Sequence, residues 1–260
     1  MRNSIVIHWF RQDLRIQDNP SLHEAAQQGT VLPIYILDDE NAGEHRMGEA
    51  SRWWLHHSLQ ALNKSLKGKL AVYKGNPKKI LIDLVQEHNV KAVNWNRCYE
   101  PWRIARDKKI KKALEAHNTD SQSFNGSLLW EPWEILKKDG TPYKVFTPYY
   151  RKGCLSAASP KMPLPKPAKL KLYEDKTNSL LIDDLELLPT IKWDKQLETH
   201  WEIGELGAQK RLEKFTVNRL ENYKQGRNFP ALNTVSRLSP HLHFGEISPN
   251  QAWYAAKKNE

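Results

Sequence analysis

The sequence predicts an α/β fold, a doubly wound parallel sheet of five strands, followed by a long linker and the truncated start of an all-helical unit. Three observations lead to this prediction. Short apolar runs alternate with amphipathic helical patterns as far as residue 124, a basic proline-rich stretch follows, and helical periodicity returns after residue 201. Strands that alternate with helices pair in parallel through right-handed crossovers, so helices cover both faces of the sheet.

The first strand is predicted at residues 4–10, which form a nearly continuous apolar run. Such a run is typical of a strand that is covered on both faces. The charged residues 11–15 form a turn, and an Asp-Asn-Pro sequence at residues 18–20 supplies an N-cap and a proline for the first turn of a helix. Ser21 and Glu24 offer a capping box at the same helix start.

The same alternation continues along the first half of the chain. The helix over residues 48–67 carries apolar residues at a spacing close to 3.6, and the helix that begins at Pro77 follows an asparagine that can cap it. The other helices are predicted to end near residue 28 and to cover residues 101–117. The other strands are predicted at residues 31–37, 70–73, 92–95 and 120–124.

Ligands on a doubly wound sheet bind outside the carboxyl ends of its strands. Here the first strand is followed by Arg11, Gln12 and Asp13, and no glycine-rich turn occurs at this place. Because glycines are what let a backbone approach a pyrophosphate in this turn, the dinucleotide fingerprint is absent. The sequence therefore excludes a conventional NAD-binding domain.

Residues 131–200 are predicted to connect the sheet to a second unit. Their first part is rich in proline and aromatic residues and is expected to lie across a surface as a strap. Residues 159–171 are extended, basic and proline-rich. A charged linker of this kind is usually only solvated, and direct contact with nucleic acid is the alternative.

The second unit is predicted over residues 201–260. A helical pattern covers residues 204–225, and residues 233–249 then combine hydroxyl groups, an arginine, a proline and a new helix start. Hydroxyls and backbone N–H groups can bind phosphate oxygens there, and an arginine screens their charge. We therefore expect a phosphate-bearing ligand; the alternative is that the two Ser-Pro pairs of this segment only start helices.

The composition limits the partners. The chain has 260 residues and a formal net charge of +10, which suggests a polyanionic partner such as nucleic acid. Its ten tryptophans are many for a mean hydropathy of -0.72, and they suggest stacking surfaces or a chromophore environment in addition to core packing. No apolar run is long enough to span a membrane, and no signal-peptide pattern precedes the first strand.

The metal-binding and redox residues indicate a reducing, cytoplasmic environment. Cys98 and Cys154 lack metal-ligand spacing, which argues against a disulfide framework and a zinc site. His241 and His243 have a ligand-like spacing, but no third ligand accompanies them. No metal site is predicted.

Short motifs spread along the chain carry a family resemblance. They are residues 9–15 (WFRQDLR) with 18–20 (DNP), 95–97 (WNR) through 106–107 (RD), 144–148 (KVFTP), 236–240 (SRLSP) and 244–249 (FGEISP). In this order they resemble the photolyase/cryptochrome family, and in particular bacterial photolyases that repair cyclobutane pyrimidine dimers. The resemblance extends from about residue 5 to the last residue.

The resemblance implies three parts: a Rossmann-like antenna domain at residues 1–130, an interdomain linker at 131–200, and the start of the helical FAD domain at 201–260. In this family reduced FAD absorbs blue light, directly or from an antenna chromophore, and passes an electron to a dimer flipped out of DNA. The electron returns after the ring splits. Flipping is the usual way in which an enzyme reaches a stacked base.

Family members are much longer than this chain. We therefore expect a fragment that lacks the catalytic half and is itself inactive, so no catalytic residue is assigned. Damaged DNA is the expected partner of the full-length parent, and no oligomeric state is predicted. A cryptochrome-like blue-light receptor and a non-catalytic chromophore-binding module remain the alternatives.

The resemblance also implies which residues bind FAD near its phosphates. They are Tyr223, Arg227, Thr234, Val235, Ser236, Arg237, Leu238 and Ser239. The family commonly has Thr-Ser-x-Leu-Ser in this loop, and an ungapped alignment puts Val235 at the threonine. Since valine has no hydroxyl, this contact is lost, passes to Thr234, or falls to the Val235 N–H, a difference of about 1 kcal/mol in FAD affinity.

The antenna chromophore is expected in a cleft near Arg11, Asp13 and the loop 96–103. In folate-binding relatives an acidic side chain of this loop contacts the pterin ring. Arg103 stands at that place here, and Glu100 is the nearest substitute. Methenyltetrahydrofolate is the first expectation and a deazaflavin the second, while Arg103 as an ordinary surface charge is the alternative.

Overall fold

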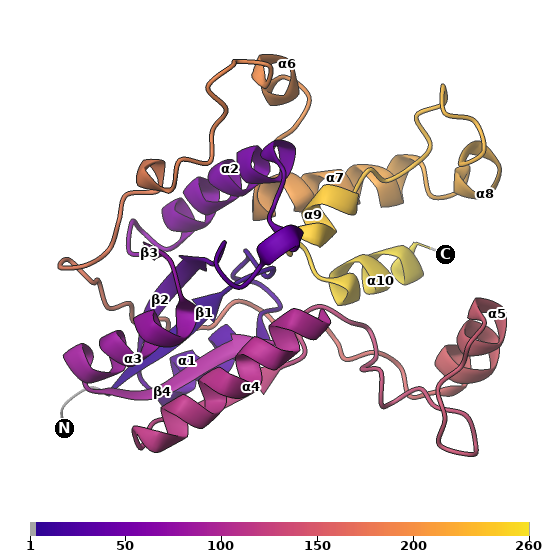
Figure 1. Ribbon diagram of the computed structural model, residues 1–260. Coiled ribbons are helices and arrows are strands. Elements are labelled where there is room, and N and C mark those ends of the chain that lie inside the picture. The colour runs from indigo at the N-terminus through magenta and orange to yellow at the C-terminus, as the bar shows by residue number, and fades with distance from the viewer. Residues whose placement is uncertain (1–3, 260) are drawn as a thin grey trace.

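A single parallel sheet forms the centre of the first half of the chain (Figure 1). In the computed structural model, which describes residues 4–259, the strand order is β3-β2-β1-β4-β5. The strands are β1 (Ile5–Phe10), β2 (Thr30–Leu37), β3 (Ala71–Lys74), β4 (Val90–Asn96) and β5 (Asp120–Phe124). All neighbours pair in parallel, and the order reverses between β1 and β4. The predicted doubly wound sheet is confirmed.

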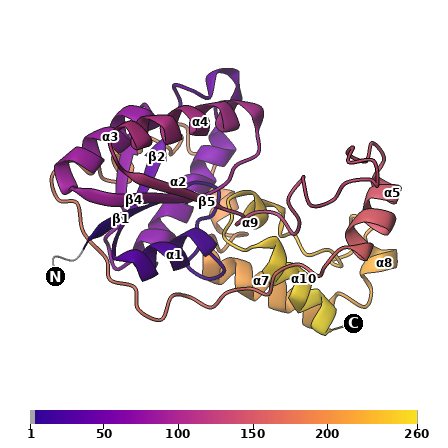
Figure 2. The same ribbon diagram turned by 90° about the horizontal axis from the view of Figure 1, so that it is seen from below.

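Helices cover both faces of the sheet, as Figures 1 and 2 show. They are α1 (Pro20–Gln28), α2 (Glu49–Ser65), α3 (Pro77–His88) and α4 (Pro101–Ala116). Leu22 of α1 and Leu59 of α2 belong to one apolar core, whereas Leu81 of α3 and Ile110 of α4 belong to the other. The strands between the two cores are buried on both sides, which explains their continuous apolar runs.

The start of α1 differs from the prediction in one detail. Asn19 is the N-cap, and its side-chain oxygen accepts a hydrogen bond from the Leu22 N–H at 3.1 Å. Ser21 therefore lies inside the first turn, where its hydroxyl contacts His8 Nδ1 at 2.9 Å. The predicted capping box of Ser21 and Glu24 is wrong because Asn19 already occupies the capping position.

The segment that connects the sheet to the helical unit is anchored along its path. Leu172 forms a parallel bridge with Val31, where β3 does not yet cover the edge of β2. Asp175 accepts a hydrogen bond from the Tyr73 hydroxyl at 2.5 Å. The short helical turns of the chain are Gly43–His45, α5 (Phe146–Pro148), Tyr149–Gly153, Cys154–Ser156, Asp183–Leu185 and α6 (Lys195–Glu198).

The last part of the chain is helical but more interrupted than predicted. Its helices are α7 (Glu205–Asn218), α8 (Tyr223–Gly226), α9 (Ser239–His243) and α10 (Pro249–Lys258). The single helix predicted over residues 204–225 is wrong. The N–H groups of Arg219 and Leu220 both donate to the Phe215 carbonyl, which ends the regular ladder, and asparagines at residues 218 and 222 favour helix ends over helix interiors.

A buried carboxylate ties this helical part to the sheet unit. Glu246 is fully buried, and its Oε1 accepts hydrogen bonds from Trp54 Nε1 of α2 at 3.1 Å and from the Gly204 N–H at 3.0 Å. Its Oε2 lies 2.5 Å from Nδ1 of the buried His241 in α9. One side chain thus holds α2, the entry to α7, and α9 together.

The backbone around this carboxylate is equally constrained. Gly245 has a φ of +66°, and a Cβ atom there would lie 2.1 Å from the Gln12 carbonyl oxygen. Arg15 donates to the Gly245 carbonyl at 3.0 Å and to the Gly126 carbonyl at 2.7 Å. The turn after β1 and the turn after α9 therefore pack backbone to backbone.

Candidate functional site

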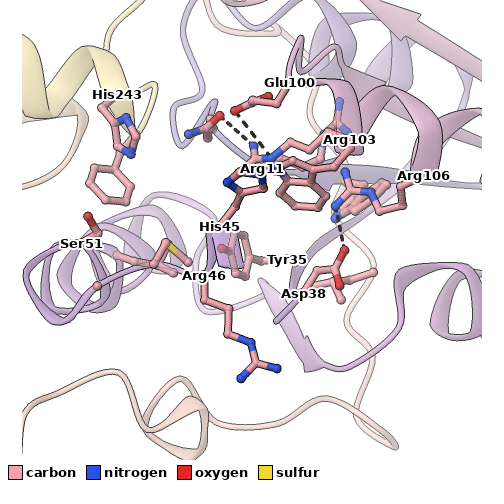
Figure 3. Close-up of a pocket in the computed structure, with 18 of the residues that line it drawn as sticks. Arg11, Tyr35, Asp38, His45, Arg46, Ser51, Glu100, Arg103, Arg106 and His243 are labelled. Atoms are coloured by element: carbon pink, nitrogen blue, oxygen red, sulfur yellow. Dashed lines mark hydrogen bonds and ion pairs between the residues drawn. The ribbon is translucent and has the colours of Figure 1, made fainter. Parts of the chain in front are cut away.

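A cavity of about 500 Å³ lies at the carboxyl ends of β1, β2 and β4. Figure 3 shows Arg11, Arg103 and Arg106 on one side of it and Ser51 and His243 on the other. The sheet and α4 supply the arginines, α2 supplies the serine, and α9 supplies the histidine. The cavity thus lies at the topological switch point of the sheet, where doubly wound folds bind ligands.

Indole rings and guanidinium groups alternate along the arginine side of the cavity. The Arg11 and Arg106 guanidinium carbons lie 5.0 and 4.9 Å from the centre of the Trp9 ring. Those of Arg103 and Arg106 lie 5.0 and 5.2 Å from the Trp102 ring. These cation–π contacts hold planar cations against planar rings, and the wall suits a planar, negatively charged ligand.

Acidic partners fix two of these arginines. Arg11 Nη1 lies 2.5 Å from Asp107 Oδ2, and Arg106 Nη1 lies 2.9 Å from Asp38 Oδ2. Burial opposes the charge of the Arg11 guanidinium, but neighbouring Cys98 and Asp107 raise its pKa on balance. Arg11 is therefore a permanent cation whose orientation is set before any ligand binds.

Some polar atoms of this wall have no hydrogen-bond partner within residues 4–259. Trp9 Nε1 and Arg11 Nε are buried and unpaired there, and Arg103 Nε makes no hydrogen bond but lies 3.7 Å from Glu100 Oε1. Buried N–H groups are nearly always paired in folded proteins. Their position beside the cavity makes them candidate donors to the oxygen or ring-nitrogen acceptors of a ligand.

The helical part of the chain closes one side of the cavity through His243 and Phe244 at the end of α9. Met47 and Leu55, which belong to the sheet unit, line the cavity as well. Partial burial, and then the positive charge of Arg103, lower the pKa of His243. His243 is therefore a neutral side chain at neutral pH, able to donate one hydrogen bond and accept one.

The predicted antenna residues separate into two groups. Arg11, Glu100 and Arg103 line the cavity, and Arg103 Nη1 donates to Gln12 Oε1 at 2.8 Å. Asp13 is buried outside the lining, where its carboxylate accepts hydrogen bonds from the Arg11 N–H at 2.6 Å and from Asn96 Nδ2 at 2.6 Å. Asp13 thus holds the strand ends that carry the cavity.

Sequence reasoning missed further lining residues. Tyr35 and Asp38 lie at the end of β2, and Arg106 lies one turn into α4. Burial raises the pKa of the Tyr35 hydroxyl, so it remains protonated. The signal that could have found Asp38 is the same one that found Arg11: it directly follows a predicted parallel strand.

The residues assigned to the FAD phosphates are partly brought together. The Arg227 guanidinium lies over the Tyr223 ring at 5.4 Å. A Cβ atom on Gly226 would lie 2.4 Å from Thr234 Oγ1, so α8 packs directly against the start of the loop. The Thr234 hydroxyl is buried and unpaired within the described chain. The Thr234 hydroxyl therefore faces α8, and the exposed surface of the loop is formed by other side chains.

The remainder of this loop is open. Arg237 is exposed and adopts a left-handed conformation with φ of 53°. The Ser236 hydroxyl accepts from the Leu238 N–H at 3.4 Å, and the Val235 carbonyl accepts from Arg219. Leu238 is buried, whereas Ser239 at the start of α9 is exposed. The loop therefore presents Ser236, Arg237 and Ser239 on one open wall.

Comparison with known proteins decides the family. The family described as DNA photolyase matches residues 6–168, more than half of the chain. The chain belongs to the DNA photolyase family. The resemblance read from the motifs is confirmed.

Individual relatives cover nearly the whole chain. A deoxyribodipyrimidine photo-lyase of Agrobacterium fabrum is 40% identical over 99% of this chain and 54% of the relative. Cryptochrome-2 of Arabidopsis thaliana is 35% identical over 98% of this chain and 43% of its own length. The solved structure of a bacterial class III photolyase from Agrobacterium tumefaciens superposes with a TM-score of 0.91 at 39% identity, over 98% of this chain and 53% of that one.

The chain spans about half the length of these relatives. Family members bind FAD and an antenna chromophore and act in DNA repair or blue-light sensing. Residues 4–259 contain a sheet unit and a helical part in the arrangement of the bacterial photolyase.

Two other sequence features find their places. His241 is buried against Glu246, whereas His243 faces the cavity, so the two histidines serve different surroundings. Residues 4–259 contain no cluster of three or more histidine, cysteine or carboxylate side chains that could hold a metal ion. Among the same residues, every helix is too short or too polar to cross a membrane.

Proposed function

We propose that this chain supplies the antenna-binding unit and one wall of the FAD site of a light-dependent photolyase that splits cyclobutane pyrimidine dimers in DNA. The observation that carries this proposal is the position of α9. Its first residue, Ser239, belongs to the loop of residues 234–239, which is proposed to bind the FAD phosphates. Its last residue, His243, lines the cavity of the sheet unit. One short helix thus joins two ligand-facing regions.

The cavity fits a planar anionic antenna chromophore. Methenyltetrahydrofolate has a fused ring that can stack beside Trp9 and Trp102, and carboxylates that can pair with Arg103. Trp9 Nε1 and Arg11 Nε would donate to its ring, and Glu100 would accept from it. Bound there, the chromophore would absorb light and transfer the energy to FAD. A deazaflavin is the alternative ligand of the same cavity.

The loop fits the FAD phosphates only in part. Arg227 and Arg237 would neutralise the phosphate charge, and the hydroxyls of Ser236 and Ser239 would donate to phosphate oxygens. FAD, when bound, supplies the electron that splits the dimer. Because the loop is an open wall, we expect this chain alone to hold FAD weakly and not to repair DNA. Damaged DNA is the proposed partner of the complete enzyme, in keeping with the net charge of +10.

Chromophore retention tests the proposal. The chain is incubated with methenyltetrahydrofolate and FAD, and in a second sample with a deazaflavin and FAD. Each sample is passed through a desalting column, and its absorption spectrum is recorded. We expect the folate band to be retained and the flavin bands to be lost. Arg103→Ala should weaken folate binding at least tenfold, whereas Lys108→Ala, an exposed position on the same helix, should leave it unchanged.

Two results would contradict the proposal. If neither folate nor a deazaflavin is retained, the cavity is not an antenna site. If the chain retains stoichiometric FAD and repairs dimers in light, the expected weakness of the open wall is wrong.

A blue-light receptor is the second candidate, because cryptochrome-2 of Arabidopsis is 35% identical over 98% of the chain. Disrupting the gene that encodes this chain separates the two functions. Loss of blue-light-dependent survival after ultraviolet damage supports repair. Unchanged survival with loss of a blue-light response supports the receptor.

A further inference from the structure

A second cavity, of about 900 Å³, lies beside the carboxyl ends of β4 and β5. It is bounded by the end of β5, by the aromatic strap after residue 128, by residues 157–164, and by Asn250 of α10. No residue of the described chain lines both this cavity and the one that contains Arg103. The second cavity is therefore a separate site, and the antenna proposal does not use it.

A residue that lines this cavity has a buried carboxylate oxygen without a hydrogen-bond partner within residues 4–259. Glu131 is 4% exposed and lines the cavity wall. Its Oε1 takes the hydrogen bonds of Arg97, with Nε at 3.0 Å, while Oε2 is buried and unpaired within residues 4–259. An unsatisfied oxygen on a buried carboxylate is costly. A ligand that brings an N–H donor would remove that cost.

The hydroxyl of Tyr99 belongs to the same cluster. It is buried and makes no hydrogen bond of good geometry within the described residues, but it lies close enough to Arg97 and Glu131 for weak hydrogen bonds to both side chains. Burial, and then the negative charge of Glu131, raise the pKa of Tyr99, so the hydroxyl keeps its proton. Of this cluster, Glu131 lines the cavity and offers a carboxylate acceptor, whereas Tyr99 does not line it.

Two indole rings give the cavity its aromatic walls. Trp130 Nε1 donates to the Ala158 carbonyl at 2.9 Å, and the ring packs edge-on against Trp253 at 5.7 Å, which fixes its orientation. Trp133 is 58% exposed, and the Arg97 guanidinium lies 5.7 Å from its ring centre. An indole held by a cation on one side and open on the other can stack on a flat ligand.

From this geometry we infer that the second cavity binds a planar heterocycle whose edge carries N–H donors, the chemistry shared by a guanine base and a pterin. The heterocycle donates an N–H to Glu131 Oε2 and stacks on Trp133. Arg97 holds both groups, since it pairs with the Glu131 carboxylate and contacts the Trp133 ring. The strap residues Trp-Glu-Pro-Trp at 130–133 thus form a recognition element.

Calorimetric titration of the chain tests this inference. The probes are guanosine and 6-hydroxymethylpterin, which present N–H donors, and caffeine, a purine whose ring nitrogens offer none. The titrations are made with the first cavity filled by saturating methenyltetrahydrofolate, and we expect guanosine, the pterin or both then to bind with a stoichiometry of about one and caffeine to bind at least tenfold more weakly. Guanosine alone identifies a purine site, and the pterin alone identifies a pterin site.

Glu131→Gln is the sharpest variant. Arg97 requires an acceptor, so the glutamine carbonyl must face Arg97 and its NH₂ group must take the position of Oε2. A donor then replaces an acceptor toward the ligand, and we expect binding of the donor probes to fall at least tenfold. Circular dichroism checks that the variant is folded.

Trp133→Ala provides a second variant that does not depend on the buried charge. The exposed ring contributes little to folding, and its removal should weaken binding at least tenfold. Trp193→Ala, which removes another solvent-accessible indole far from the cavity, is the matched control and should bind as the unaltered chain does. The inference is overturned if neither donor probe binds, if caffeine binds as tightly as guanosine, or if both Glu131→Gln and Trp133→Ala bind undiminished.

Discussion

The arginine-lined cavity and the loop of residues 234–239 lie at opposite ends of α9, yet they are supported differently. Arg11 and Arg106 of the cavity form ion pairs with the carboxylates of Asp107 in α4 and Asp38 at the end of β2. Arg237 of the loop and Arg227 at the end of α8 are exposed, and the Arg227 guanidinium lies over the ring of Tyr223. One region is preorganised and the other is open.

This difference in preorganisation indicates which of the two regions can bind a ligand without further ordering of its side chains. Groups that are oriented before binding lose little entropy when a ligand arrives, whereas exposed long side chains must be ordered at a cost of up to about 1.5 kcal/mol each. The organisation of the arginine-lined cavity therefore depends mainly on the sheet unit. The loop depends on what orders it, and the fully buried Glu246 is one of the groups that connect its helical surroundings to the sheet unit.

Glu246→Ala should have the largest effect. It leaves Trp54 Nε1, the Gly204 N–H and His241 Nδ1 without their shared acceptor, and we expect the free energy of unfolding to fall by about 3 kcal/mol. Urea unfolding measures this loss. Glu213→Ala, an exposed position of α7, is the control and should change stability by less than about 0.5 kcal/mol.

The same variant tests the comparison between the two regions. Amide exchange in Glu246→Ala should accelerate over residues 204–243 and stay slow in β1 and β4, because only the former lose their connection. If exchange accelerates equally in both regions, the sheet unit does not fold independently of the helical part.

His8 should make the sheet unit sensitive to acid. Burial lowers the pKa of His8 to about 4, from an ordinary value of 6.5. Below pH 6.5 the unfolded chain takes up a proton at His8 and the folded chain does not, so stability is complete above pH 6.5 and is lost as the pH falls toward 4. Between pH 7 and pH 5 this amounts to about 2 kcal/mol.

The variant His8→Gln tests this assignment. Its urea unfolding free energy should decrease between pH 7 and pH 5 by about 2 kcal/mol less than that of the unaltered chain. His243→Gln, at a half-buried residue that lines the cavity, is the comparison variant. It should change the pH dependence of the unfolding free energy less than His8→Gln does. An unaltered pH dependence in His8→Gln would show that other groups cause the acid sensitivity.

Gly245→Ala probes the contact between the two turns. Gly245 and Gly43 both adopt a positive φ, of 66° and 52°, but only at Gly245 would a Cβ atom meet the backbone of Gln12 and Asp13. Both substitutions incur the left-handed penalty of about 1 to 2 kcal/mol, and the collision should cost Gly245→Ala about 1 to 2 kcal/mol more. Thermal unfolding of both variants measures the difference, and equal losses would show that the turns can separate.

The fold was predictable from sequence wherever apolar runs are bounded by turn residues. The predicted strand at residues 120–124 coincides with β5, and the other strands differ by only a few residues at their ends. The break after Asn218 was missed because an apolar periodicity continues across it. The bridge between Val31 and Leu172 was missed because main-chain pairing leaves no side-chain pattern.

The candidate site was predictable in part for a similar reason. Arg11 follows a strand and Arg103 opens a helix, so topology alone places both at the cavity. The buried role of Glu246 could not be predicted, because Trp54 lies 192 residues away from it in the sequence. A carboxylate in a short loop ordinarily indicates exposure, and only the packing of the helical part on α2 reverses that expectation.

Thr234→Val should have the smallest effect, and it decides how the loop replaces the hydroxyl that Val235 lacks. The Thr234 hydroxyl is buried against Gly226 and unpaired among the described residues, so its removal should leave stability unchanged or raise it by up to about 0.5 kcal/mol. FAD affinity, measured by equilibrium dialysis at high flavin concentration, should also be unchanged. Ser236→Ala, which removes a hydroxyl on the open wall, should weaken FAD binding by a few fold, since a lost hydrogen bond costs about 1 kcal/mol. A loss in Thr234→Val as large as that in Ser236→Ala would show that α8 turns away and that Thr234 donates to the phosphates.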